Sequence, residues 1–97
     1  MRVIYLLQHD KIPEYTKIGY TDDINQRIKS LSTASPTGIK LLYKRETDYA
    51  YQIEQALHKR YRSYNSNLEW FMLSENQIQE IISWIDTQLD RYERKYV

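Results

Sequence analysis

The sequence predicts an α+β domain, with a three-stranded antiparallel sheet flanked by helices in the order ββαβαα. Two short segments rich in β-branched, aromatic and aliphatic residues come first, and the loop between them is short enough to join an antiparallel pair. Apolar residues then recur at helical spacing in three later segments. The chain of 97 residues has the length of one domain, so we expect a single domain over 1–97.

The three strands are expected over residues 2–7, 15–20 and 39–45. The first is apolar throughout, which is typical of a buried strand, and the second alternates between apolar and polar residues. Gly19 lies inside the second strand, and an internal glycine of this kind indicates a bulge or a place where another group approaches the backbone closely.

The first helix is expected over residues 23–31, capped by Thr21 or Asp22, and a loop follows over 32–38. A second helix is expected over about 48–63. The buried stripes of these two helices comprise Ile24, Ile28 and Leu31, and then Ala50, Ile53, Leu57 and Tyr61.

Residues 65–67 break the second helix, and 69–73 are expected to be a short apolar insertion. Ser74 and Gln77 form a capping box for the last helix, expected over 75–95. Its buried stripe comprises Ile78, Ile81, Ile82, Ile85, Leu89, Tyr92 and Tyr96. Trp84 lies off this stripe, so we expect its side chain to face outward.

The composition excludes several classes of protein. Because the chain contains no cysteine, it cannot be a disulfide scaffold, hold a thiolate zinc site or an iron–sulfur cluster, or use a cysteine nucleophile. No apolar run approaches the roughly 18 residues of a membrane span, and the first ten residues become polar too early for a signal peptide. We therefore expect an intracellular protein that does not bind membranes.

The charge is unevenly distributed along the chain. Residues 1–62 carry 11 Lys and Arg against 7 Asp and Glu, whereas residues 63–97 carry 3 against 6, for a net charge of +1. This asymmetry is typical of a protein with one face that meets an anion, although chance accounts for it equally well. The near-neutral total argues against a protein that simply coats nucleic acid.

Glu54 and His58 are the residues most suggestive of chemistry. They are four residues apart, so both project from one face of the second helix, beside the buried Leu57. A carboxylate that borders the core needs a partner, for which a divalent cation or an arginine would serve. Taken singly, however, such a glutamate is more often part of a surface salt bridge, and such a histidine a satisfied core residue.

Five short segments follow one another in an order and spacing that carry more weight than any one of them: Val3-Ile4-Tyr5, Lys17-Ile18-Gly19, Arg27, Glu54-x-x-Leu57-His58 and Glu69-Trp70-Phe71. Together they resemble the GIY-YIG nuclease superfamily, and most closely its small phage- and virus-associated branch. The resemblance covers about residues 2–78. It implies a metal-dependent endonuclease that hydrolyses DNA phosphodiester bonds through an activated water.

The resemblance implies roles for the residues of the two half-motifs. Tyr5 corresponds to the tyrosine that takes a proton from the attacking water. Lys17 replaces the tyrosine of the second half-motif, and is expected to hold the phosphate or to lower the pKa of its neighbour. Gly19 would let the backbone approach the substrate, and Tyr20 occupies a position where relatives place a polar residue.

On the helices, Arg27 corresponds to an arginine that stabilises the transition state. Glu54 corresponds to the carboxylate that holds one Mg²⁺ or Mn²⁺, weakly bound without substrate. His58 is expected to contact substrate or to orient Glu54. Lys29 belongs to the basic residues that could follow a DNA backbone. Glu69 falls near a late polar position of the family, whereas Trp70 and Phe71 are expected to be buried core residues.

Two other functions stay open at this point. The domain could bind nucleic acid with little or no catalysis, because Lys17 departs from the tyrosine of the family pattern. It could also be a protein-interaction domain that uses Trp84 of the last helix. With DNA as the expected partner, we expect a monomer or a weak homodimer.

Overall fold

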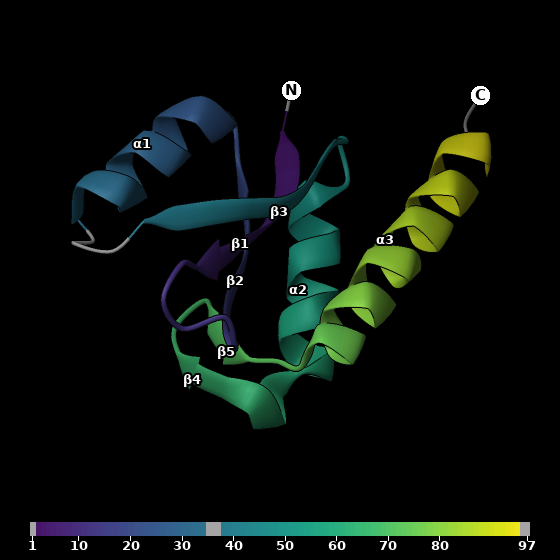
Figure 1. Ribbon diagram of the computed structural model, residues 1–97. Helices are drawn as coiled ribbons and strands as arrows, with labels where there is room; N and C mark the ends of the chain where they lie inside the picture. Colours follow the sequence, from purple (N-terminus) through teal and green to yellow (C-terminus); the bar gives the residue numbers. More distant parts are fainter. Residues whose placement is uncertain (1, 35–37, 96–97) are drawn as a thin grey trace.

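The structure is a computed structural model that describes residues 2–34 and 38–95, and it confirms the α+β class (Figure 1). A sheet of five strands carries helices on both faces. In chain order the elements are β1 (Val3–His9), β2 (Tyr15–Thr21), α1 (Ile24–Ala34), β3 (Ile39–Glu46), α2 (Ala50–Arg60), the short 3₁₀ helix η1 (Arg62–Tyr64), β4 (Asn65–Asn67), β5 (Trp70–Met72) and α3 (Glu75–Lys95).

The sheet has more strands than the three that the sequence predicts. Its order is β3-β1-β2-β5-β4, and every neighbouring pair is antiparallel. The two additional strands were expected to be a helix break and an apolar insertion. They are three residues each, too short to show an alternating pattern, and β5 is extended because it pairs with Tyr15–Lys17 of β2. Tertiary pairing therefore creates these strands.

The helix boundaries differ from the expected ones by a few residues. Asp23, rather than Thr21 or Asp22, caps α1, because its side chain accepts a hydrogen bond from the backbone N–H of Gln26 at 3.1 Å. Helix α1 continues to Ala34 through the first part of the predicted loop, and residues 35–37 of that loop lie outside the described residues. Helix α2 ends at Arg60, before η1.

The start of α3 is as predicted. The Ser74 hydroxyl accepts a hydrogen bond from the Gln77 N–H at 3.2 Å, and the Gln77 side chain accepts one from the Ser74 N–H at 2.9 Å. This reciprocal pair is the capping box.

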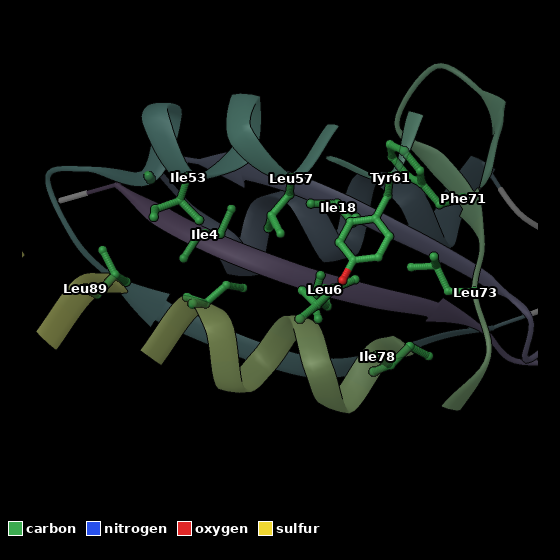
Figure 2. Packing of buried hydrophobic residues seen from close by; sticks show 13 residues of the cluster. Ile4, Leu6, Ile18, Ile53, Leu57, Tyr61, Phe71, Leu73, Ile78 and Leu89 are labelled. Atoms are coloured by element: carbon green, nitrogen blue, oxygen red, sulfur yellow. The ribbon is translucent and has the colours of Figure 1, made fainter. Parts of the chain in front are cut away.

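Alternate residues of β1 face opposite sides of the sheet. Ile4 and Leu6 belong to the larger core cluster with α2 and α3, and Figure 2 shows side chains of both helices converging on them. Val3, Tyr5 and Leu7 belong to a second cluster with Ile24 of α1. The apolar run of β1 is thus explained by helices on both faces.

Helix α3 packs against the larger cluster mainly through the predicted stripe. Four stripe residues are fully or almost fully buried, namely Ile78, Ile81, Ile85 and Leu89. Trp84 was expected to face outward, but it is partly buried and packs against the same cluster. The large indole reaches the core from the edge of the stripe, so it is not a free apolar surface. Tyr96 lies outside the described residues.

Arg45 of β3 ties the sheet to α3. Its guanidinium group lies 3.0 Å from carboxylate oxygens of Asp86, Asp90 and Glu93. These residues are spaced at i, i+4 and i+7, so they share one face of α3.

None of the helices in the described residues combines the length and apolar character that a membrane span requires.

Candidate functional site

The candidate site lies on the side of β2 that faces away from β1. Beyond Lys17, no strand of the described residues pairs with this side. Strand β5 pairs only with Tyr15–Lys17, so the rest of β2 meets other groups. His58 Nε2 donates a hydrogen bond to the carbonyl oxygen of Ile18 at 2.8 Å, and the backbone N–H of Tyr20 donates one to Glu54. Both side chains come from α2, which therefore completes the hydrogen bonding of this edge.

An open pocket of about 480 Å³ lies at this edge, and we call it the catalytic pocket because candidate catalytic residues from the sequence analysis line it. It is lined by Lys17 of β2, Arg27 of α1, Glu54 and His58 of α2, and Leu68 and Glu69 of the turn between β4 and β5. Four of the sequence-predicted residues thus meet in one place, although they come from three separate elements.

Tyr5 lies behind this pocket, on the interior strand β1. It is fully buried, and its phenol oxygen accepts a hydrogen bond from Arg27 Nε at 3.3 Å. Gly19 is its partner in the β1–β2 register. A β-carbon at position 19 would lie 2.6 Å from Tyr5 Oη, closer than real side chains come. The close approach expected at Gly19 is therefore made by the ring of Tyr5.

Replacing Gly19 with alanine should shift Tyr5 and the Arg27 guanidinium that bonds to it. We expect Gly19→Ala to lower the free energy of unfolding by about 1–3 kcal/mol, the usual cost of overpacking. Urea denaturation measures this cost, which should shrink in a Tyr5→Ala background because the clash is then gone.

The matched control is Gly38→Ala. A β-carbon at position 38 would only make ordinary contact with the Asp10 side chain at 3.5 Å, so its effect should be small. Equal costs for the two glycine substitutions would contradict the assignment of the clash to Tyr5.

Glu69 lines the catalytic pocket, although the sequence analysis assigned it no specific role. Its carboxylate lies 2.7 Å from Lys17 Nζ and 3.7 Å from Arg27. The only sequence signal was its position directly before Trp70 and Phe71. With Glu54, it makes two carboxylates against two basic side chains, Lys17 and Arg27, so the formal charges of these four residues balance.

Glu54 is a buried carboxyl group, with 4% of the residue exposed. Burial raises its pKa, whereas His58, the Gln55 side chain and the N–H of Tyr20 act to lower it. Within residues 2–34 and 38–95, no lysine or arginine forms an ion pair with Glu54. Among these residues, hydrogen bonds from Gln55 and from the Tyr20 N–H meet the carboxylate in place of a salt bridge.

Burial also raises the pKa of Tyr5, and the hydrogen bond and charge of Arg27 oppose this effect. The phenol is accordingly protonated at neutral pH in the free protein.

The two remaining predicted residues do not line the catalytic pocket. Tyr20 is half-buried and packs edge-on against Tyr51, with 5.7 Å between ring centroids. Lys29 is exposed on α1. Phe71 is buried as predicted, whereas Trp70 is only half-buried, at the surface beside the pocket.

The family model of the T5orf172 domain matches residues 2–86, which cover the sheet, the catalytic pocket and the first half of α3. The chain belongs to the T5orf172 domain family. This domain occurs in phage and viral proteins and is related to GIY-YIG-like nuclease folds. The sequence motifs indicated a resemblance to the GIY-YIG nuclease superfamily. The T5orf172 match supports this resemblance at the level of the fold.

One similar protein is "Uncharacterized protein 460R" of Invertebrate iridescent virus 6. It is 35% identical over 69 residues, which cover 69% of this chain and 31% of the viral protein. The matched segment thus spans about a third of that relative. No solved structure matches the chain significantly.

Proposed function

We propose that this T5orf172 domain is a metal-dependent endonuclease that hydrolyses DNA phosphodiester bonds. The observation that carries the proposal is the catalytic pocket itself, where Lys17, Arg27 and Glu54 converge from three elements, with Tyr5 directly behind Arg27. Phosphodiester hydrolysis uses such groups: cations that bind phosphate, a carboxylate that binds a metal ion, and a phenol that loses its proton and, as the phenolate, accepts one from the attacking water.

Arg27 and Lys17 hold the phosphate in this proposal. The guanidinium group of Arg27 offers paired N–H donors that match two phosphate oxygens, and Lys17 adds a compact positive charge. Both stabilise the charge that grows on the phosphate oxygens as water attacks. His58 fixes α2 against β2 through Ile18, and so keeps Glu54 in place.

Tyr5 is the proposed proton acceptor. Because its oxygen is buried behind Arg27, it meets the attacking water only when Arg27 turns toward the phosphate. The positive charge of Arg27 beside Tyr5 favours the phenolate, which offsets part of the effect of burial.

Glu54 fits a divalent cation, because it is a buried carboxylate without a cationic side chain bonded to it. Within the described residues there is no cluster of three His, Cys, Asp or Glu, so water and phosphate oxygens would complete the ligands of a weakly held Mg²⁺ or Mn²⁺. When bound, such an ion lowers the pKa of a coordinated water and offsets charge on the phosphate.

One observation favours the alternative, a DNA-binding module without catalysis. Glu69 already occupies the space between Lys17 and Arg27, so a phosphate must displace a carboxylate from both cations. Glu54 would hold a divalent cation whose charge would favour this exchange in an otherwise balanced pocket. The alternative predicts DNA binding with no cleavage at any metal concentration.

Plasmid nicking tests the proposal. Purified protein with Mg²⁺ or Mn²⁺ should convert supercoiled plasmid to open circles, and EDTA should stop the reaction. Arg27→Ala should slow nicking by about 10²–10³-fold, as for the loss of one donor to a developing oxyanion. Arg62→Ala is the control, because Arg62 is an exposed arginine outside the catalytic pocket. Binding without nicking, or equal rates for both variants, would overturn the proposal.

A further inference from the structure

A second pocket lies beside the catalytic pocket, and we call it the aromatic pocket. Its lining residues are His9, Tyr15, Ser66, Asn67 and Trp70. We propose that it stacks an unpaired nucleobase next to the phosphate that is cleaved. The inference rests on the proposed function, and it specifies the substrate as DNA with a single-stranded segment at the cut.

Three half-exposed aromatic rings form the aromatic pocket. The centroid of the Trp70 ring lies 6.4 Å from the ring of His9 and 6.4 Å from that of Tyr15, and both pairs are edge-to-face. The aromatic pocket lies among these rings, so a flat ring that enters it would pack against aromatic side chains. Base stacking on such side chains is the common way in which proteins hold single-stranded nucleic acid.

The aromatic pocket lies next to the catalytic pocket along β2 and β5, although no residue lines both. Lys17 and Trp70 are partners in the strand register, and Lys17 Nζ lies 5.4 Å from the centroid of the Trp70 ring. Tyr15 and Lys17 are two residues apart on β2, so their side chains lie on the same face of the sheet, about 6.6 Å apart along the strand. A phosphate at Lys17 therefore places an adjacent base within reach of Tyr15 and Trp70.

The size of the aromatic pocket selects a ring rather than a larger ligand. Its volume of about 220 Å³ is below the roughly 300–1,000 Å³ of pockets that enclose drug-sized molecules. Ser66 and Asn67 supply a hydroxyl and an amide at the rim, and Ser66 also bonds to the Tyr15 hydroxyl at 3.2 Å. Polar groups at the rim of an aromatic wall suit the polar edge of a nucleobase.

The β4–β5 hairpin (Figure 1) carries Ser66, Asn67 and Trp70 of the aromatic pocket. The Asn65 side-chain amide donates to the carbonyl oxygen of Leu68 at 2.6 Å and to that of Trp70 at 3.3 Å. The backbone of Glu69 also accepts a hydrogen bond from Ile18. Trp70 is thus presented by a hairpin braced against β2. A base in a duplex is stacked inside the helix, so only an unpaired base can reach this ring.

Trp70 fluorescence tests the inference. The chain has two tryptophans, so Trp84→Phe leaves Trp70 as the only one. The variant also carries Glu54→Gln, which should prevent cleavage during titration. A short single-stranded oligonucleotide, labelled for anisotropy, should bind and quench Trp70, whereas the same sequence annealed to its complement should quench it much less.

Alanine substitution locates the contact. Tyr15→Ala should weaken binding of the single strand by about 5- to 150-fold, the range measured for loss of one stacked base. Tyr64→Ala is the matched control, because Tyr64 is an exposed tyrosine that lines neither pocket.

The two proposals can fail separately. Oligonucleotide binding without quenching of Trp70, equal quenching by the duplex, or equal effects of the two tyrosine variants would overturn the stacking inference and leave nicking by the wild type untouched. Quenching and weakening as described, with no nicking by the wild type, would support the stacking inference and overturn the nuclease.

Discussion

Glu54→Gln should reduce plasmid nicking by about 10³-fold or more while the protein stays folded. Glutamine keeps the shape of the side chain and can still accept the hydrogen bond from the Tyr20 N–H. It removes the negative charge that would hold a divalent cation. Initial rates over a range of Mg²⁺ concentrations measure this loss, and added metal should not restore the wild-type rate.

The same substitution should not lower stability. Burial raises the pKa of Glu54, so the folded state binds its proton more tightly than the unfolded chain does. The stability linked to this group is therefore present at low pH and is lost as the pH rises through the folded pKa. Above the folded pKa the ionised carboxylate opposes folding, and its replacement by a neutral amide should leave the free energy of unfolding unchanged or raise it.

Glu75→Gln is the control for both measurements, since Glu75 is exposed at the start of α3 and outside the catalytic pocket. It should change neither nicking nor stability. Full activity of Glu54→Gln would refute the metal-binding role, and a large loss of stability would show that Glu54 is a structural group.

Tyr5→Phe should reduce nicking by about 10²–10⁴-fold, the usual contribution of a positioned acid or base. It should also remove most of the pH dependence. Burial raises the pKa of Tyr5, so only a small fraction of the phenol is ionised near neutral pH. That fraction grows tenfold with each pH unit below the pKa. The wild-type rate should therefore rise from about pH 7 to about pH 9 without reaching a plateau.

The measurement is the initial rate of nicking across this pH range at saturating metal. Tyr64→Phe, at an exposed position, should keep both the rate and the slope of the wild type. A wild-type rate that is flat over the range, or a Tyr5→Phe profile parallel to that of the wild type, would show that another group accepts the proton.

Much of the catalytic pocket could be predicted because its residues follow local patterns. The 3.6-residue period of α2 buries Ile53 and Leu57. The same period places Glu54 and His58 together at the margin of that face. Strand alternation likewise places Tyr5 and Gly19 within the sheet. The separation of Lys17, Arg27 and Glu54 along the chain is large, however, and only the ordered motifs indicated that the three would meet.

Other features could not be predicted, because they depend on contacts between distant segments. The ion pair of Glu69 with Lys17 exists because β5 pairs with β2, and three-residue strands carry no period that reveals them. Trp84 reaches the core although it lies off the helical stripe, since a large side chain at the edge of the stripe can lie over its neighbours.

The α+β class, the first three strands and the three helices follow from the sequence alone, because period and capping are properties of short segments. The tertiary structure alone decided the five-stranded sheet, the balance of charge in the catalytic pocket and the position of Trp70 beside His9 and Tyr15. These features arise from pairing between segments far apart in the chain, and the free energy of such pairing depends on the partner as much as on the segment itself.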